Sequence, residues 1–318
     1  MSEAQFAAAP PSTAQRPPEA VQGAARLSDW GLIRARGEDA RSFLHGQLTQ
    51  DMLGLAPDAA RLAGYCTAKG RLLASFVVLS DGPQDLLLAC SADLLAAAMK
   101  RLSMFVLRAR CKLDDVSAQH GLWGVAGGDG LPDPWRRRDE PGMTLIGLPP
   151  ALDGGAFVPR ALCLTAADGS PAQPPLSESD WRWLEVLSGV PRIVAATSER
   201  FVPQMVNLDL AGGVNFQKGC YPGQEVVARS QYRGTLKRRG ALLSSASPAA
   251  PGDEIFHSDD PGQPAGQVAL AASTCASHAV FAELKIAALA EGSLHLGSVE
   301  GPLLRPLPLP YAVPAEQA

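Results

Sequence analysis

The stretch from Lys218 to Arg229 reads KGCYPGQEVVAR and sets one cysteine among groups that could make it react. Cys220 has no second cysteine nearby, so a local disulfide and a C-x-x-C metal site are both excluded. Lys218 precedes it by two residues, and a nearby cation favours the thiolate, which is the nucleophilic form. A helix that begins near Gln224 adds its positive N-terminal end. The spacing therefore predicts a reactive or redox thiol.

The surrounding region, residues 201–239, is rich in groups that could bind a polar ligand. Its glycines permit tight backbone geometry. Its amides and acids include Gln204, Asn207, Gln224 and Glu225. Such side chains offer both donors and acceptors, so we count these four as candidate site residues. The same pattern also fits a surface loop that leads into a helix.

A run of positive charge follows the thiol. It consists of Arg229, Arg233, Lys237, Arg238 and Arg239, five cations within eleven residues. No acidic residue interrupts the run. One interpretation is an anion site, with Arg229 and Arg233 as binding candidates, for either a carboxylate-bearing ligand or a phosphate backbone. The other interpretation is a solvated strand edge.

The composition limits the possible functions. The chain has 318 residues, 46% apolar and 19% charged, which is typical of two or three globular domains. A net charge of −4 argues against wholesale binding to nucleic acid or to an anionic membrane. No run of eighteen apolar residues occurs, so we expect no membrane-spanning helix, a cytoplasmic location and, by default, a monomer. The five histidines lack metal-ligand spacing, so we expect no metal site and assign histidine no catalytic role.

The hydrophobic pattern predicts the elements that position these groups. Residues 30–35 predict a strand, and the stretch from about Asp39 predicts a helix that ends at Gly46. Residues 70–116 predict a strand, a turn, a second strand, a helix capped by Ser91 and a further strand. Such an α+β unit packs its helix on one face of its sheet.

The rest of the chain predicts loops, one more helix and a β-rich end. Residues 127–142 and 168–180 are dense in glycine, proline and charge, which favours loops. A capping-box spacing at Ser177 predicts a helix. From Lys237 onward, short strands split by turns predict a small β-barrel or sandwich that ends in a proline-rich tail. The first 25 residues, rich in alanine and proline, predict a disordered tail.

Taken together, these segments resemble the YgfZ-type folate-binding proteins, which are relatives of the glycine-cleavage aminomethyltransferase. The resemblance rests on KGCYPGQEVVAR and on segments that stand in the expected order, among them DWGLI, FLHGQLTQDM, CTAKGRLLASF, DWRWLEVLSGVPRI and YRGTLKRR. It implies an α+β fold of three lobes arranged as a ring, with a C-terminal small β-barrel. The implied domains are a tail over residues 1–25, a folate-binding region over 26–235 with 56–118 as an inserted α+β lobe, and a barrel over 236–316.

The resemblance also implies a function. It implies a protein that binds tetrahydrofolate or a related folate and serves iron-sulfur enzymes, tRNA-modifying ones among them, by assembly or repair under oxidative stress. The implied thiol is Cys220, flanked by Lys218, Tyr221, Gln224 and Glu225. Trp30 and Trp181, which offer flat stacking surfaces but are by default core residues, match the folate-associated tryptophans. A folate-dependent one-carbon transferase or demethylase and a tRNA-binding scaffold remain as alternatives.

Two positions depart from the relatives' pattern. True aminomethyltransferases carry an acid on the strand that reads GRLLASFVVL here, where the matching position falls at or next to Ala74. We therefore expect no aminomethyl transfer by the relatives' mechanism. Leu187 stands where relatives often carry Glu or Gln for the pterin ring. Glu185 lies about 200° around the helix from that position, so we expect it not to reach the site.

Overall fold

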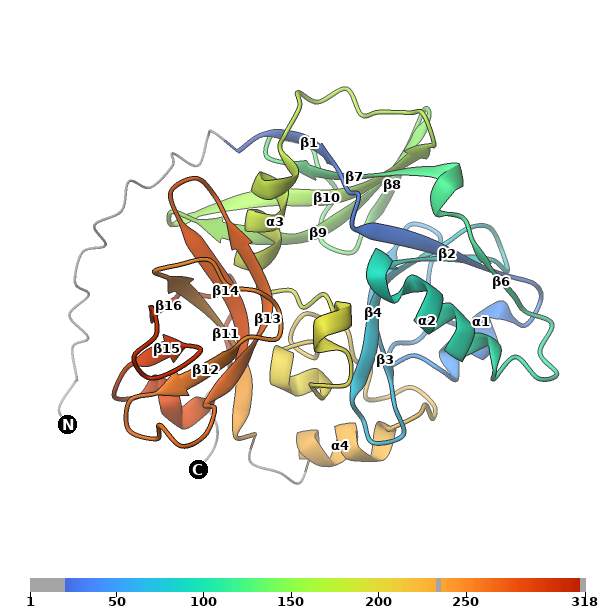
Figure 1. Cartoon of the computed structure of the whole chain (residues 1–318). Helices are drawn as coiled ribbons and strands as arrows, with labels where there is room; N and C mark the ends of the chain where they lie inside the picture. Colours follow the sequence, from blue (N-terminus) through green and yellow to red (C-terminus); the bar gives the residue numbers. More distant parts are fainter. Residues whose placement is uncertain (1–20, 233–235, 315–318) are drawn as a thin grey trace, which may run out of the picture.

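The computed structural model describes residues 21–232 and 236–314, which form three lobes around a central segment (Figure 1). Two lobes are five-stranded antiparallel sheets, and the third is a closed barrel of six strands. Helices pack against the sheets and fill the centre. The predicted α+β fold with three lobes and a C-terminal β-barrel is confirmed.

The first lobe is a sheet in the order β3-β4-β5-β2-β6. Its strands are β2 (Trp30–Arg36), β3 (Ala60–Cys66), β4 (Leu72–Ser80), β5 (Leu86–Ser91) and β6 (Lys112–Asp115). Helix α2 (Ala92–Ser103) follows Ser91, as the sequence predicts, and buries Leu94, Ala98 and Leu102 against the sheet. Helix α1 (Ala40–His45) is also where the sequence predicts it, and it ends at Gly46.

The limits of this lobe differ from the predicted insertion at residues 56–118. Strand β2 lies between β5 and β6, so the lobe takes in residues 30–36 as an interior strand. The pairing is between segments far apart in the chain, and periodicity carries no information about such partners. The predicted tail is also too long, because Val21 is buried and β1 (Gly23–Arg26) pairs with β7 (His120–Ala126). Residues 1–20 of that tail lie outside the described residues.

The second lobe is a sheet in the order β1-β7-β10-β9-β8. Its remaining strands are β8 (Arg137–Glu140), β9 (Met143–Asp153) and β10 (Ala156–Ala166). Strand β8 lies inside a stretch predicted as loop. Helix α3 (Glu178–Leu187) starts as predicted, because the Asp180 N–H donates to the Ser177 hydroxyl at 3.0 Å. It buries Trp181 and Leu184, and it contacts both this sheet and the barrel.

The barrel closes in the order β11-β14-β13-β12-β15-β16. Its strands are β11 (Arg238–Ser245), β12 (Glu254–His257), β13 (Gly266–Ser273), β14 (His278–Lys285), β15 (Leu294–Leu296) and β16 (Leu303–Leu307). The last strand comes from the stretch predicted as a proline-rich tail. At Pro306 it has a neighbouring strand only on the β11 side, so a missing N–H is tolerated there.

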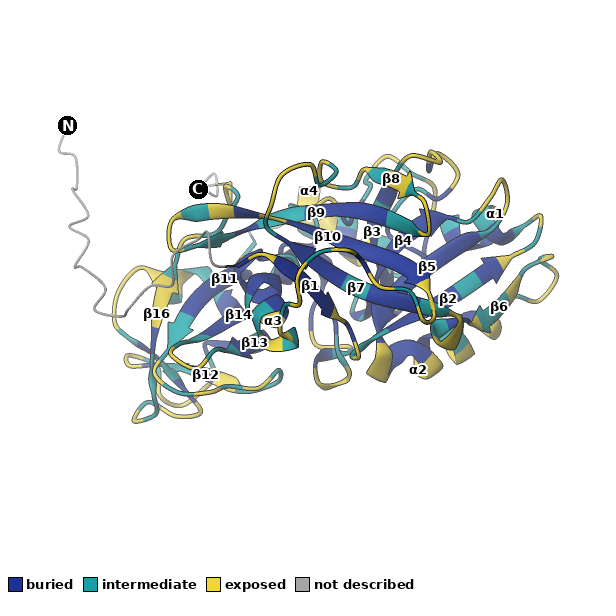
Figure 2. Cartoon of the chain, turned by 90° about the horizontal axis from the view of Figure 1, so that it is seen from above, coloured by how far each residue is buried: buried dark blue, intermediate teal, exposed yellow. Residues whose placement is uncertain are grey.

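A central segment joins the second lobe to the barrel and holds most of the predicted site residues. It contains helix α4 (Gln224–Tyr232) and short 3₁₀ turns at Ala195–Thr197 and Pro203–Val206; other such turns are Ser117–Gln119 and Ile286–Leu289. Figure 1 shows α4 near the turn between β3 and β4. Figure 2 shows that the strands are largely buried, whereas exposed residues gather on loops and on the outer face of α2.

Candidate functional site

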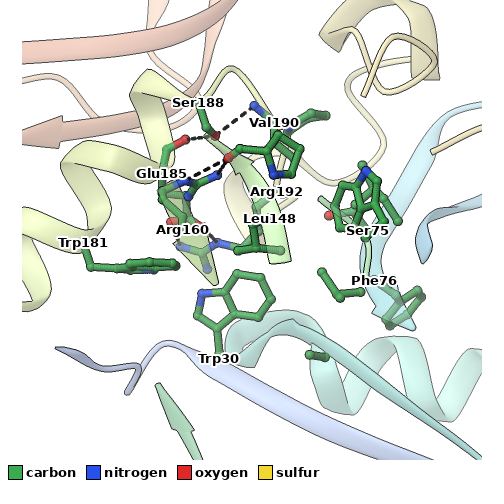
Figure 3. Close-up of a pocket in the computed structure, with 16 residues that line it drawn as sticks. Trp30, Ser75, Phe76, Leu148, Arg160, Trp181, Glu185, Ser188, Val190 and Arg192 are labelled. Atoms are coloured by element: carbon green, nitrogen blue, oxygen red, sulfur yellow. Dashed lines mark hydrogen bonds and ion pairs between the residues drawn. The ribbon is translucent and has the colours of Figure 1, made fainter. Parts of the chain in front are cut away.

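A pocket opens where the two sheets meet the end of α3. It encloses about 430 Å³ of empty volume, part of it open to solvent, and most of its lining is apolar. Figure 3 shows Trp30 between the Trp181–Arg160 pair on one side and Ser75 and Phe76 on the other. The pocket therefore brings together the two tryptophans that the sequence singles out, one from β2 and one from α3.

Both indoles are held in place by buried arginines. The guanidinium carbon of Arg192 lies 5.2 Å from the ring centroid of Trp30, and that of Arg160 lies 5.3 Å from the ring of Trp181. The N–H groups of both indoles are buried without a hydrogen-bond partner among the described residues. Gly124 on β7 leaves room for Trp181, because a Cβ at this glycine would lie 2.2 Å from the indole. The pocket thus has flat apolar walls with donors that a ligand could use.

A third tryptophan, which the sequence analysis missed, lines the same pocket. Trp135 precedes β8 and has the left-handed backbone angle φ 62°, which is unusual for a bulky residue. Its backbone is clamped between the lobes, since its N–H donates to the Gly147 carbonyl and its carbonyl accepts from Ala60 N–H. Strain of this kind persists only where surrounding contacts hold it. The signal was the tryptophan itself, inside a stretch dismissed as loop.

The charged groups of the pocket form a network around Arg192. Its guanidinium donates to both carboxylate oxygens of Glu185, at 2.8 and 2.9 Å. It also donates to Asp29 at 2.8 Å and to the Ser91 hydroxyl at 3.0 Å. Burial alone would lower the pKa of Arg192, but the charges of Glu185 and Asp29 outweigh it and raise that pKa. The network therefore keeps Arg192 charged inside the protein.

Arg160 is a second buried cation without such a partner. Its guanidinium donates to the Pro149 carbonyl at 2.9 Å, and no described carboxylate forms an ion pair with it. Burial lowers its pKa to about 10, and the more distant charge of Glu185 offsets this only in part. A buried cation that lacks its own counter-charge is costly, so an acceptor or anion supplied by a ligand would be favourable here.

The ion pair between Glu185 and Arg192 lines two recesses and forms a wall between them. A second recess, of about 780 Å³ of empty volume, shares Glu185 and Arg192 with the first and opens toward barrel strand β13 through Leu270. Its other charged walls are Asp29, Asp93 and Arg182. One recess is therefore apolar and lined with indoles, and the other is lined with charge.

Two expectations about this pocket change. Glu185, which we expected not to reach the site, lines it, because the chain turns at Ser188 and brings Arg192 back against the helix. Leu187 is buried but is not part of the lining. Next to Ala74, where relatives carry an acid, the buried Ser75 faces the pocket and its hydroxyl accepts from Ile193 N–H at 3.0 Å. Among the described residues that line the pocket, Glu185 is the one carboxylate.

The thiol loop, residues 217–223, forms a separate site. Cys220 is exposed and free. Lys218 is half-buried beneath it, and its ammonium donates to the carbonyls of His45 and Leu48, the latter at 2.7 Å. The same ammonium lies 5.0 Å from the ring centroid of the buried Tyr221. Desolvation lowers the pKa of Lys218 to about 8, although the charges of Asp51 and Cys220 oppose this.

The thiol loop is seated on the β3–β4 turn by glycines. Gly223 has φ +80°, and a Cβ there would lie 2.4 Å from the Thr67 carbonyl oxygen and 2.6 Å from the Cα of Gly70. This close approach fixes the start of α4 at Gln224, which confirms the predicted helix there. Glu225 is exposed at the first turn and pairs with Arg229 at 3.3 Å.

Several predicted ligand-binding residues have structural tasks instead. The Asn207 amide donates to the Gly240 carbonyl at 2.9 Å and accepts its N–H at 3.1 Å, so it ties the central segment to the barrel. The Gln204 amide donates to the Val227 carbonyl at 2.9 Å. Both are fully buried, and neither lines the pocket.

The described arginines of the positively charged run pair with acids of this chain. Arg238 pairs with Glu283, and Arg239 pairs with Asp209, so two cations of the run serve the barrel. Arg229 is exposed beside Glu225 and does not line the pocket. Arg233 lies outside the described residues. The acids come from distant parts of the chain, which is why the run looked unbalanced in sequence.

The pocket and the thiol loop share one support, the β3–β4 hairpin. Leu62 on β3 lines the pocket, whereas Cys66 at the end of the same strand leads into the turn beneath the thiol loop. Leu62 and Cys66 are four residue steps apart along the strand, about 13 Å at 3.3 Å per residue. Cys220 does not line the pocket. The structure therefore contains two sites on one element.

Comparisons with known proteins agree with this architecture. The chain is 34% identical over 248 residues to the tRNA-modifying protein YgfZ of Edwardsiella ictaluri, covering 74% of each chain. It is 31% identical to that of Colwellia psychrerythraea, with 79% and 78% covered, and 29% identical to that of Sodalis glossinidius, with 90% and 92% covered. No protein-family model matches the chain.

Among solved structures, the crystal structure of glycine cleavage system aminomethyltransferase T from Bartonella henselae is similar, with a TM-score of 0.68 at 13% identity. The match covers 91% of this chain and 86% of that one. The likeness shows a common fold. Within residues 21–232 and 236–314, no helix is long and apolar enough to cross a membrane, and no three His, Cys, Asp or Glu side chains gather into a metal-binding group.

Proposed function

Because the chain belongs to the YgfZ family of tRNA-modifying proteins, we propose that it is a tetrahydrofolate-binding accessory protein for iron-sulfur enzymes. Its clients or assembly partners would include tRNA-modifying enzymes, and its work would be assembly or repair under oxidative stress. We place it in the cytoplasm as a monomer, and its six free cysteines fit a reducing compartment. The observation that carries the proposal is the tryptophan-lined pocket with its buried ion pair.

The residues of this pocket fit a reduced folate. A pteridine ring is flat, and its amide-like edge presents N–H donors beside a carbonyl acceptor. Trp30, Trp135 and Trp181 supply flat apolar surfaces for the ring. The Glu185 carboxylate can accept from the N–H edge, and the Arg160 guanidinium can donate to the carbonyl. Bound tetrahydrofolate would supply a carrier for one-carbon units.

The residues of this chain favour folate binding over folate turnover. Both oxygens of the Glu185 carboxylate accept hydrogen bonds from Arg192, so this carboxylate is already engaged within the protein and is poorly placed to act as a general base. At the relatives' acid position, Ser75 offers a hydroxyl that already accepts a backbone N–H. One-carbon transfer or demethylation remains the second candidate, since Glu185 lines the pocket. An amine donor that turns over tetrahydrofolate in the presence of the protein would favour that candidate.

A role as a tRNA-binding scaffold has less support. Phosphate binding needs cations that are free to neutralise phosphates. Arg238 and Arg239 are engaged in ion pairs with acids of this chain, and Arg229 lies beside Glu225. We therefore expect tRNA to be reached through client enzymes, and a steep salt dependence of direct tRNA affinity would argue against this.

Folate binding is tested by Trp30→Ala, with Trp123→Ala as the matched control. Trp123 has a buried indole N–H without a described partner, as Trp30 does, but it lies on β7 outside the pocket. Titration calorimetry with tetrahydrofolate should give about a tenfold weaker Kd for Trp30→Ala and little change for Trp123→Ala. Equal affinities for both variants would contradict the pocket assignment.

The service to iron-sulfur enzymes is tested through the thiol. Cys220→Ser should fail to restore iron-sulfur enzyme activity in a deletion strain under oxidative stress. Cys275→Ser is the control, since Cys275 is also exposed and free but lies at a barrel hairpin. Full rescue by Cys220→Ser would remove the thiol from the proposal.

A further inference from the structure

We propose that Cys220, His45 and Asp51 form a proton relay, in which His45 takes the thiol proton and Asp51 stabilises the imidazolium that results. The relay deepens the proposed function, because it rests on Cys220 being the working thiol. It gives a role to a histidine that metal-ligand spacing alone had set aside. The residues come from the end of α1, the loop after it and the thiol loop.

His45 is aimed at the backbone that carries the thiol. It is the last residue of α1, and its side chain is 18% exposed, so the ring is accessible yet positioned. A Cβ at Gly219 would lie 3.5 Å from His45 Nε2. Gly219 is the residue immediately before Cys220, and it has no side chain to separate the ring from the loop. A rotation of the exposed Cys220 side chain then decides whether its sulfur meets Nε2.

The other ring nitrogen of His45 faces a carboxylate. His45 Nδ1 lies 2.9 Å from Asp51 Oδ1. The contact does not have the direction of a linear hydrogen bond, so the carboxylate acts through its charge, and its attraction to the ring becomes strong once the ring is protonated. An orienting group on the far nitrogen of a histidine base is the arrangement that supports thiol and hydroxyl nucleophiles.

Asp51 is kept ionised for this role. It accepts backbone N–H groups of Leu53 and Gly54 at 3.0 and 3.1 Å, and Arg61 lies 3.0 Å from its other oxygen. Partial burial would raise the pKa of Asp51, but these hydrogen bonds and the Arg61 charge outweigh it and lower that pKa. The carboxylate is therefore charged at neutral pH and available to an imidazolium.

Lys218 connects the thiol loop to the end of α1, where His45 lies. Its ammonium donates to the carbonyl of His45 itself and to that of Leu48, so the thiol loop and the end of α1 are fixed to one another. The charged groups of the relay are thus Asp51, which faces the ring, Arg61, which pairs with Asp51, and Lys218, which binds the backbone carbonyl of His45. The same ammonium lies 5.0 Å from the ring centroid of Tyr221, the residue that follows Cys220, so its charge lies close to the thiol loop.

The chemical step is a single proton transfer. The S–H bond of Cys220 breaks, and its proton binds the lone pair of His45 Nε2. The products are a thiolate and an imidazolium, and the imidazolium lies beside Asp51 while the thiolate lies near Lys218. No oxidant or other reactant is consumed, and the exposed thiolate is then the nucleophile that meets a client.

The test is alkylation of Cys220 by iodoacetamide in the full chain, followed by mass spectrometry of the Cys220 peptide. His45→Gln should lower the alkylation rate near pH 7 about tenfold, because an amide cannot take a proton. Near pH 10, where thiols ionise unaided, the rates of variant and parent should converge. His278→Gln, in the barrel hairpin, should leave the profile unchanged.

Two results separate a relay from mere packing. Asp51→Asn should lower the rate near pH 7 by a smaller factor, about threefold, since it removes only the stabilising charge. In NMR, the titration of the His45 ring should shift on Cys220→Ser, and this measurement needs no variant of His45. An unchanged alkylation profile in His45→Gln, or an unchanged ring titration in Cys220→Ser, would overturn the relay. Loss of iron-sulfur support in Cys220→Ser together with either result would leave the proposed function standing.

Discussion

The pocket and the thiol loop both rest on the β3–β4 hairpin, but they differ in how far their functional groups are buried. The pocket is built from strands β2, β3, β4, β5, β9 and β10, helix α3, the segment after it and the loop before β8, and its charged residues Glu185, Arg192 and Arg160 are buried. The thiol loop is one short segment, and its cysteine is exposed. Burial raises the pKa of Cys66, beneath the loop, to about 12, so that thiol stays protonated while Cys220 meets solvent. The comparison shows that the charged groups of the pocket are buried by packing, whereas the thiol of Cys220 is left accessible.

The largest effect is expected at Arg192, where a substitution should destabilise the pocket and leave the thiol loop unchanged. Arg192→Met leaves the buried Glu185 without its cation, which should lower the free energy of unfolding by about 3–5 kcal/mol. Urea denaturation measures the loss, and adding Glu185→Met should restore most of it, because a buried ion pair replaced by apolar groups is close to neutral. Alkylation of Cys220 in native buffer should not change. A double variant as unstable as the single one would contradict this account of the pair.

A smaller effect is expected at Gly124. In Gly124→Ala the new Cβ would meet the Trp181 ring at 2.2 Å, so the indole must move, at a cost of about 1–3 kcal/mol. Tetrahydrofolate affinity should fall because a pocket wall shifts, while the thiol loop is untouched. Gly262→Ala is the control, since its Cβ would meet nothing within 4 Å. Unchanged folate affinity in Gly124→Ala would show that Trp181 is not a binding wall.

These two sites also differ in what the sequence could reveal. The thiol loop is contiguous in the chain, so the sequence alone indicates that Lys218 and Cys220 lie close together and that α4 begins just after them. The pocket is assembled from distant segments, and Trp30 and Trp181 were singled out only through the family resemblance. Glu185 was misjudged because helical angle ignores the return of Arg192 against the helix. The sequence did not predict that Trp135 lines the pocket. Its backbone conformation depends on hydrogen bonds with Gly147 and Ala60, and no local sequence pattern indicates these partners.

His45 was missed for a related reason. Its spacing to other histidines is irrelevant to a role that depends on Asp51, a neighbour along the chain, and on Gly219, which lies far away in sequence. The polar set of the central segment shows the reverse error. Gln204 and Asn207 looked like ligand groups because their density is local, yet their partners are backbone groups of α4 and β11. Local density of polar residues indicates a network, and only tertiary contacts decide what it binds.

The partial burial of the Lys218 ammonium in the thiol loop should make stability depend on pH. The ordinary pKa of 10.5 holds in the unfolded chain, and burial lowers it to about 8 in the fold. Between these values the unfolded chain binds more protons, so stability rises with pH there, whereas below about pH 8 the cost of the buried charge is fully present. Lys218→Met should remove this rise, worth about 1 kcal/mol after allowance for partial exposure.

The measurement is the difference in unfolding free energy between Lys218→Met and the parent at about pH 7.5 and pH 10. This difference should change by about 1 kcal/mol in favour of the parent as pH rises, while contributions from other titrating groups cancel. Lys237→Met provides the control, because Lys237 is exposed. A difference that stays constant for Lys218→Met would mean that its ammonium is solvated in the fold.

The smallest effect is expected at Arg229, and it tests the corrected anion site. Its pair with Glu225 is exposed on both sides, so Arg229→Gln should change the free energy of unfolding by less than about 0.5 kcal/mol. Tetrahydrofolate affinity should be the same as in the parent, since Arg229 does not line the pocket. A loss of affinity that disappears at high salt would instead indicate that the positively charged run binds the ligand. The folate tail would then have to reach from the pocket to α4. Because Leu62 in the pocket and Cys66 beneath the thiol loop are about 13 Å apart along β3, that outcome would also join the two sites into one, and the division between a binding pocket and an accessible thiol would no longer hold.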